Sequence, residues 1–207
     1  LRLQVANMRD EYEMTALHCA AYSGDLESFK TLLALYPESQ HLATIGMQIE
    51  FGKTLLHCMA CSSNAEILKY ILGLIPETEL LRVVNQRDME GMTVLHWAAC
   101  SYDLESIKAV IDMVPESQYM EALCMQDAEQ MTPLHYAAGS AECMTFLLGL
   151  LSESERSQAM DMRNAKGNSV LYCVITQCSS DSITTVLSFL QHSSPGEAKI
   201  DQSQSCI

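Results

Sequence analysis

The chain of 207 residues has little positive charge, and this shortage excludes several classes of partner. It contains 12 Lys and Arg against 26 Asp and Glu, which gives a net charge of −14. Nucleic acids and anionic membrane surfaces attract proteins that carry a surplus of positive charge. We therefore expect no nucleic acid and no membrane as partner. The negative field instead favours a basic or amphipathic segment of another protein.

Long apolar runs and the usual catalytic loops are also missing. No stretch of 18 uncharged apolar residues could span a membrane, and no signal peptide is visible. The sequence has no Gly-rich phosphate loop and no nucleophile elbow. Nine cysteines occur at irregular intervals in a chain that is 48% hydrophobic and needs no disulfides for stability. We expect reduced, mostly buried thiols and a cytoplasmic location.

Four near-copies of one phrase recur every 39 residues. They are Thr15-Ala16-Leu17-His18, Thr54-Leu55-Leu56-His57, Thr93-Val94-Leu95-His96 and Thr132-Pro133-Leu134-His135, and an altered copy, Ser169-Val170-Leu171-Tyr172, follows 37 residues later. A fixed period of about 20 to 50 residues is typical of repeat proteins, in which each unit buries its apolar face only against its neighbours. The sequence predicts a solenoid, a class that generally binds rather than catalyses.

The sequence of each unit predicts a pair of helices followed by a short third helix. The first helix begins at the Thr, which we expect to cap it by accepting a backbone N–H bond. The second helix carries apolar residues at helical spacing. The fourth unit lacks two residues in the turn between its first two helices, and once this deletion is allowed for, its apolar residues occupy the same positions. The stripe comprises Phe29, Leu32, Leu33, Leu68, Ile71, Leu72, Ile107, Val110, Ile111, Met144, Leu147 and Leu148. Pro-Glu pairs at 37–38, 76–77 and 115–116, and Ser-Glu at 152–153, predict the third helix.

A turn precedes each Thr and carries the family resemblance. Asp10, Asp88, Asp127 or Asn164 stands five residues before the Thr or Ser, and Gly52, Gly91 and Gly167 stand two before it, where a tight turn requires positive φ. The segment Asp88-Met89-Glu90-Gly91-Met92-Thr93-Val94-Leu95-His96-Trp97-Ala98-Ala99 resembles an ankyrin repeat. Ankyrin units usually have about 33 residues. The longer units, with their Pro-Glu-Ser segment, also resemble ankyrin-repeat effectors that intracellular bacteria inject into host cells.

The resemblance covers about residues 7–191 and implies an all-α ankyrin-repeat solenoid of about five units of about 39 residues. We expect units one to five at 7–45, 46–84, 85–123, 124–160 and 161–192, the last being a capping unit. Residues 1–6 parallel the end of a unit, so we expect them to close a preceding one, with a further region upstream of Leu1. Residues 193–207 are expected to be a polar tail.

Histidine and cysteine are frequent enough that a catalytic or metal site has to be considered. In ankyrin repeats the His of the recurrent phrase is a structural strut, which is the role implied for His18, His57, His96 and His135. Cys58 and Cys61 lie beside His57, but no second Cys/His pair with zinc-ligand spacing accompanies them. A Cys–His nucleophile, for example Cys100 or Cys61 with a neighbouring His, would need an electropositive setting, which an acidic chain does not supply. We expect no catalytic residue, no metal and no cofactor.

The resemblance implies a binding groove formed by the turn tips and the outward positions of the first helices. Apolar side chains stand on the tips, rimmed by glutamates, and such a surface indicates a partner site. Alternatively, the glutamates keep the solenoid soluble and the methionines pack under the next turn. The candidate protein-binding residues are Glu11, Tyr12, Met14, Tyr22, Glu50, Phe51, Lys53, Met89, Glu90, Met92, Tyr102, Glu129 and Met131.

Two functions are compatible with these features of the sequence. In the first, the chain is a monomeric protein–protein interaction module, part of a secreted bacterial effector that acts on a host protein in the host cytosol. In the second, it is an accessory domain that presents substrate to a catalytic region upstream of Leu1. No enzymatic activity is expected of the fragment itself, and the activity of the full-length protein stays open.

Overall fold

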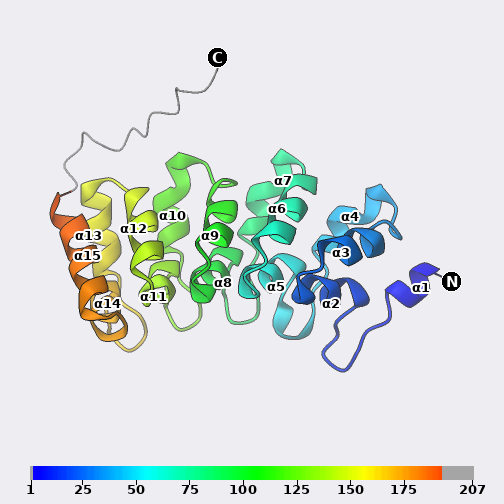
Figure 1. The fold of residues 1–207 in the computed structure, drawn as a ribbon, viewed down its shortest axis with the longest axis horizontal. Helices are drawn as coiled ribbons and strands as arrows, with labels where there is room; N and C mark the ends of the chain where they lie inside the picture. Colours follow the sequence, from blue (N-terminus) through cyan, green and yellow to red (C-terminus); the bar gives the residue numbers. More distant parts are fainter. Residues whose placement is uncertain (1, 193–207) are drawn as a thin grey trace, which may run out of the picture.

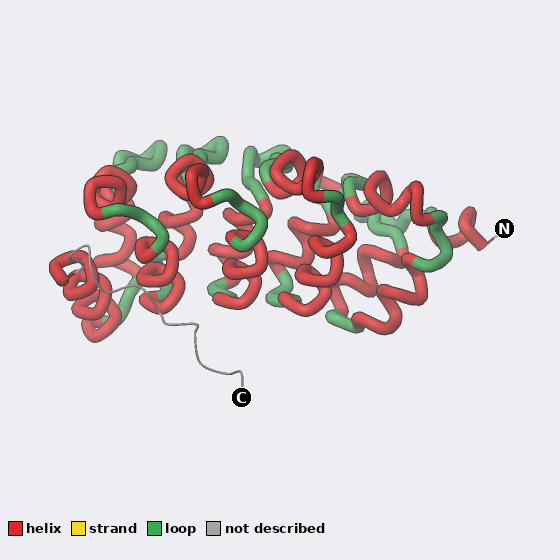
Figure 2. The backbone as a smooth tube through the Cα atoms, turned by 90° about the horizontal axis from the view of Figure 1, so that it is seen from above, coloured by secondary structure: helices red, strands yellow, loops and turns green. Residues whose placement is uncertain are grey.

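A computed structural model describes residues 2–192, and within that range the chain is a row of stacked helices without a named strand. Figure 1 shows the units side by side along the long axis, with the third helices along one edge and the turn loops along the other. Figure 2 shows the same row from above, with the helices of successive units aligned. The expected all-α repeat solenoid is confirmed.

The helices repeat in the predicted order of first, second and third. Units one and two contain α2 (Ala16–Ser23), α3 (Leu26–Leu33), α4 (Glu38–Ile45), α5 (Leu55–Cys61), α6 (Ala65–Leu74) and α7 (Glu77–Val84). Units three and four contain α8 (Val94–Ser101), α9 (Leu104–Ile111), α10 (Tyr119–Cys124), α11 (Pro133–Ala137), α12 (Ala141–Gly149) and α13 (Glu153–Asp161). The first described helix is α1 (Arg2–Ala6), and the last are α14 (Val170–Gln177) and α15 (Ser180–His192). Two 3-10 turns, η1 (Glu50–Gly52) and η2 (Glu116–Gln118), complete the set.

A single apolar core runs through the stack. It extends from Ala6 to Val186, and the pairs of small residues in the first helices lie inside it. Ala98 and Ala99 have no exposed surface, so the neighbouring first helices approach closely, as expected of a narrow solenoid. All the predicted stripe residues of the second helices are buried except Leu32, which is half-buried.

The third helices begin as predicted at the Pro-Glu pairs. Pro37 and Pro76 precede α4 and α7 with φ of −57°, the value that starts a helix, and Glu38 and Glu77 occupy the first turn. In unit three the same segment is broken into η2 and α10. In unit four, where two residues are missing from the turn, α11 has only five residues and α12 starts at Ala141.

The expectation that the thiols are mostly buried is wrong for part of the set. Cys58, Cys143 and Cys173 are buried, but Cys19, Cys61 and Cys100 are exposed. The three exposed thiols lie on first helices whose opposite faces are used for packing, so their side chains point to solvent. All eight cysteines before residue 193 are free. Cys206 and the expected tail at 193–207 lie outside the described residues.

None of the helices between residues 2 and 192 has the length and apolar character that crossing a membrane requires.

Candidate protein-binding surface

The turn that carries the candidate residues has the same hydrogen bonds in each copy that begins with Asp or Asn. In unit three, the Oδ1 atom of Asp88 accepts the backbone N–H groups of Glu90 at 3.0 Å and Met92 at 2.9 Å. The backbone N–H of Asp88 donates to the Met92 carbonyl at 3.0 Å. An Asp or Asn side chain that bonds its own backbone in this way fixes a tight turn. Asp10, Asp127 and Asn164 make the corresponding bonds.

Backbone hydrogen bonds join the tips of successive turns. The Met89 N–H donates to the Phe51 carbonyl, and the Ala128 N–H donates to the Glu90 carbonyl, both at 2.9 Å. The Ala165 N–H donates to the Glu129 carbonyl at the same distance. The side chains at the tips are therefore held on a rigid support at regular spacing, which lowers the entropy lost when a partner binds.

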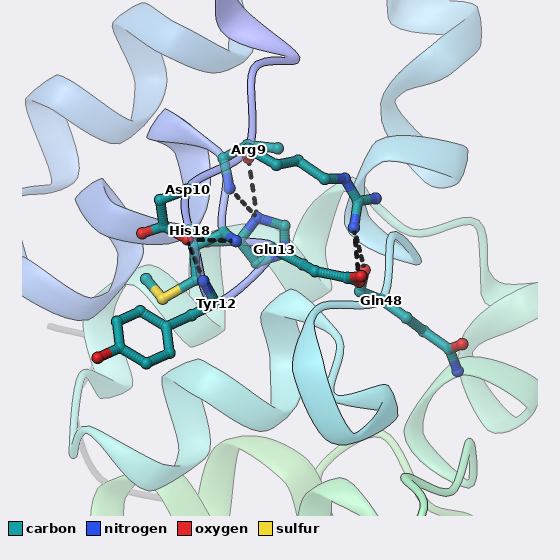
Figure 3. Close-up of polar contacts among 8 residues, drawn as sticks. Arg9, Asp10, Tyr12, Glu13, His18 and Gln48 are labelled. Atoms are coloured by element: carbon teal, nitrogen blue, oxygen red, sulfur yellow. Dashed lines mark hydrogen bonds and ion pairs between the residues drawn. The ribbon is translucent and has the colours of Figure 1, made fainter.

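Arginine side chains add a second link between neighbouring turns. Arg9 donates from Nη1 to the Gln48 carbonyl at 3.0 Å and to the Glu13 carboxylate at 3.3 Å, as Figure 3 shows. The Tyr12 ring points away from this network in the same view. Arg87 repeats the arrangement in unit three by donating to the Gln126 carbonyl at 2.7 Å. These two arginine side chains therefore stabilise the turns by linking neighbouring units.

The recurrent His is a strut between units. In unit three, the Thr93 N–H donates to Nδ1 of His96 at 3.1 Å, and Nε2 of His96 lies 3.0 Å from the Met125 carbonyl of the next turn. Because Nδ1 accepts and a carbonyl only accepts, Nε2 carries the proton and the ring is neutral. Burial lowers the pKa of His96 to about 4, although the Asp127 carboxylate raises it somewhat. His57 and His135 have the same role.

Most of the candidate binding residues are at the surface. The exposed ones are Glu11, Tyr12, Tyr22, Glu50, Phe51, Met89, Glu90, Tyr102 and Glu129, and the half-buried ones are Met14, Lys53 and Met131. Met89 is 78% exposed and Phe51 is 54% exposed, and the two residues are consecutive in the ladder of turn tips. Large apolar side chains in such positions carry a hydration cost that a partner would remove.

The expectation that all the turn methionines lie outside the core is wrong for Met92. Its side chain is only 3% exposed, because it packs under the next unit, where its sulfur lies 3.9 Å from the Tyr136 hydroxyl. Met92 therefore offers almost no surface to a partner. Met92 therefore follows the alternative prediction, in which the turn methionines pack under the next turn.

Two aromatic residues of the first helices belong to this surface although the sequence did not point to them. The Lys53 ammonium lies 3.9 Å from the Trp97 ring centroid, and Trp97 donates from Nε1 to the Asp88 carboxylate at 2.8 Å. Tyr136 stands at the equivalent position of unit four and donates to the Asp127 carboxylate at 2.7 Å. Their positions in the sequence could have indicated them, because both aromatics immediately follow the recurrent His and lie nine residues after the turn Asp.

The structure gives no support to a reactive thiol at Cys58 or Cys100. Both ring nitrogens of His57 already have protein partners, Thr54 and the Gln86 carbonyl, so this ring is not free to act as base or ligand. Burial raises the pKa of the Cys58 thiol to about 11 and also raises the pKa of Cys100. A nucleophilic thiol requires the opposite shift. Within residues 2–192, no group of three or more His, Cys, Asp and Glu side chains could hold a metal ion.

Comparison with protein families agrees with this architecture. A model described as ankyrin repeats (3 copies) matches residues 37–120 and 73–159, and a model of the single ankyrin repeat matches residues 12–37. The chain belongs to the ankyrin-repeat family. Domains of this family are generally non-catalytic modules that bind other proteins, and this chain is such a protein-binding module. A search of curated proteins finds no match to it.

Proposed function

We propose that the turn tips and the adjoining ends of the first helices bind a basic or amphipathic segment of another protein. The observation that carries this proposal is the row of exposed apolar side chains, Tyr12, Phe51 and Met89, on consecutive turns that are joined by backbone bonds. Glu11, Glu50 and Glu90 stand beside them and are also exposed. Apolar area supplies the affinity of such a surface, and the surrounding carboxylates select a partner of opposite charge and speed its approach.

The narrower part of the proposal concerns the biological setting. The long unit with its Pro-Glu-Ser third helix resembles that of bacterial effectors, and we propose that the chain is the binding part of such a protein and acts as a monomer in the host cytosol. The other candidate, an accessory domain for an upstream catalytic region, needs the same surface. A partner that is also chemically modified by the full-length protein would favour this second function.

Capture from eukaryotic cytosol tests the surface directly. The unchanged chain is compared with a variant carrying Glu50→Lys, Phe51→Ala, Met89→Ala and Glu90→Lys. A matched control carries Glu66→Lys, Leu74→Ala and Glu116→Lys, which alter exposed residues of the second helix α6 and of the η2 turn. Circular dichroism confirms that all three proteins are folded.

We expect one protein to be retained by the unchanged chain and the control and to be lost from the tip variant. The purified partner should then bind the unchanged chain with an affinity that decreases as salt concentration rises, since exposed charges are screened. Equal retention by all three chains, or retention by none, would refute the proposed surface.

A further inference from the structure

The second helices of units two and four carry a glycine at the same position near their C-terminal ends, in different surroundings. Gly73 and Gly149 each stand nine residues after the residue that precedes the helix, Asn64 and Ser140. A side-chain carbon built on Gly149 would lie 3.7 Å from the Phe189 ring of unit five. A carbon built on Gly73 would have no other described part of the chain within 4 Å. The place that a ring covers in unit four is therefore open in unit two.

In unit four the chain covers this place with a ring and a cation of its own. The guanidinium carbon of Arg156 lies 5.0 Å from the centroid of the Phe189 ring. Arg156 also donates from Nε to the Leu148 carbonyl near the end of α12, at 2.7 Å. A cation over an aromatic ring is attracted by the face of the ring, and a cation near the last carbonyls of a helix is stabilised by the helix dipole. Unit four thus shows which side chains suit this position.

Units two and three supply neither group. The residue that corresponds to Arg156 is Leu80, since each stands three residues after the Glu that opens the third helix. The residue that corresponds to Phe189 is Met113, since each stands ten residues after the residue that caps the second helix. A hollow of about 680 Å³ remains between the two units. We call it the unit 2–3 hollow.

The lining of the unit 2–3 hollow is apolar with a negative rim. Glu77 and Asp112 are its charged residues, both are exposed, and no residue of the lining is basic. Asp112 caps the C-terminal end of α9, where the helix carbonyls add to its negative field. An apolar group with a positive charge beside it matches both features. The apolar lining includes Leu72, Ile75, Leu80, Leu81, Met113 and Val114.

Basic residues near this rim in the sequence already have acidic partners. Lys108, four residues before Asp112, lies 3.0 Å from the Glu105 carboxylate. Arg82, five residues after Glu77, lies 2.6 Å from the Glu79 carboxylate. The charges of these two cations are offset by those partners, so the negative rim is available to a cation from outside the chain.

We propose that the unit 2–3 hollow binds an aromatic side chain of another protein, with an arginine or lysine next to it in the same segment. The ring lies beside Gly73, and the cation faces the Glu77 and Asp112 carboxylates. This is a second binding surface, because the hollow lies on the edge formed by the third helices and the turn tips lie on the other edge (Figure 1). The inference rests on charge complementarity and on the Phe189 and Arg156 pair at the corresponding position of unit four.

Three capped tetrapeptides test this site: acetyl-Gly-Phe-Arg-Gly-amide, the same peptide with citrulline for arginine, and the same peptide with alanine for phenylalanine. Binding is followed by NMR of the full chain with labelled methionine methyl groups, in which Met113 reports on the hollow and Met89 on the turn tips. The Phe-Arg peptide should shift the Met113 signal in a saturable way. The citrulline peptide lacks the charge and should bind about threefold more weakly. The alanine peptide lacks the ring and should bind more than about tenfold more weakly.

Three results would overturn the proposal. The first is the absence of a Met113 shift up to about 20 mM of the Phe-Arg peptide. The second is equal binding of the arginine and citrulline peptides. The third is a response of Met89 without a response of Met113, which would place the peptide at the turn tips.

A variant that fills the hollow locates the bound peptide. Gly73→Leu should abolish the Met113 response, because the new side chain occupies the hollow, and its position inside α6 favours leucine over glycine. Ala34→Leu adds similar bulk at the corresponding position of unit one and should leave binding unchanged. Circular dichroism verifies the folding of both variants. Undiminished binding by folded Gly73→Leu would contradict the assignment.

A variant of the rim tests the cation separately from the ring. Glu77→Gln should weaken the arginine peptide about twofold and leave the citrulline peptide unchanged. Glu38→Gln, at the corresponding position of unit one, should change neither. Equal effects of the two glutamine variants on the arginine peptide would show that the Glu77 carboxylate does not face the cation.

The peptide test is independent of the capture experiment. The tip variant with Glu50→Lys, Phe51→Ala, Met89→Ala and Glu90→Lys should bind the Phe-Arg peptide as the unchanged chain does, at about 0.15 M salt, where distant charges are screened. Loss of a captured protein from this variant, combined with no Met113 response in the unchanged chain, would leave the turn tips as a binding surface and remove the hollow alone. A saturable Met113 response without any captured protein that depends on the tips would do the reverse.

Discussion

The Nε2 atom of His96 lies 3.0 Å from the Met125 carbonyl of the next turn, whereas the Nε2 atom of His18 is buried without a hydrogen-bond partner among the described residues. The corresponding carbonyl, that of Met47, still raises the pKa of His18, so it lies near the ring without completing a hydrogen bond to Nε2. The strut is therefore complete in unit three and incomplete in unit one. A buried donor without a partner reduces stability rather than adding to it.

Replacing the strut should thus cost different amounts in different units. We expect His96→Ala to lower the free energy of unfolding by about 1 kcal/mol more than His18→Ala, since only the former breaks an inter-unit hydrogen bond. Urea unfolding at neutral pH measures both values. His57→Ala, whose Nε2 bond to the Gln86 carbonyl is 3.1 Å, should resemble His96→Ala. Equal losses for all three would show that the bond to the next turn contributes nothing.

Acid should destabilise the fold well before the carboxylates are protonated. Burial lowers the pKa of His18 and His96 to about 4 in the folded chain. In the unfolded chain these groups take up protons near pH 6.5, at about the ordinary histidine value. Between these limits the unfolded state binds more protons, so the stability present above about pH 6.5 is lost as pH falls, by on the order of 2 kcal/mol for each group at about pH 5.

Urea midpoints measured from about pH 7.5 down to about pH 5 check this prediction. His96→Gln, which cannot take up a proton, should lose less stability over this range than the unchanged chain, although it starts less stable. An identical pH dependence in the two proteins would mean that the pKa of His96 is the same in the folded and the unfolded chain.

Core and tip residues of the same unit should differ strongly in their effect on stability. Leu95 is 3% exposed in the middle of the stack, and Leu95→Ala should cost about 2–5 kcal/mol because it leaves a cavity. Glu90 is exposed at the adjacent tip, and Glu90→Ala should have little effect. Thermal unfolding followed by circular dichroism compares them. Similar midpoints for both variants would contradict the assignment of core and tip.

A glycine at the fourth turn should stabilise the protein. Gln130 has φ of 57° at the position where units two, three and five have Gly52, Gly91 and Gly167 with φ of 73°, 78° and 80°. A non-glycine residue in this region costs about 1 kcal/mol, so Gln130→Gly should raise stability by up to about that amount. Ala128→Gly, in the same turn but without positive φ, serves as control and should not stabilise. A lower unfolding midpoint for Gln130→Gly would refute the argument from backbone strain.

The repeat period shows how far the sequence determines the fold. Because each unit packs only against its neighbours, a phrase that recurs every 39 residues specifies the same local packing each time, and the three helices of a unit follow from caps, apolar spacing and Pro-Glu pairs. The two-residue deletion in unit four could be located from the sequence in the same way, because Met144, Leu147 and Leu148 keep the apolar spacing once the deletion is allowed for. These features depend on residues that are close together in the sequence.

The candidate surface was only partly accessible to such reasoning. The turn tips could be located from sequence, but Met92 and Met89 are both methionines of one turn, and only the packing of the next unit decides that the first is buried and the second exposed. The seat of Lys53 on Trp97 likewise joins residues 44 positions apart in different units.

The sequence by itself determined the helices, their order and the stacked architecture, because these rest on local propensity and on contacts between adjacent copies of one pattern. Only the tertiary structure decided which side chains form a surface. The outcome at each position depends on the residue that the preceding turn supplies: Trp97 receives the charged Lys53, whereas Tyr136, at the equivalent position, receives the apolar Met92. Differences of this kind between nearly identical units arise from three-dimensional packing, which periodicity does not encode.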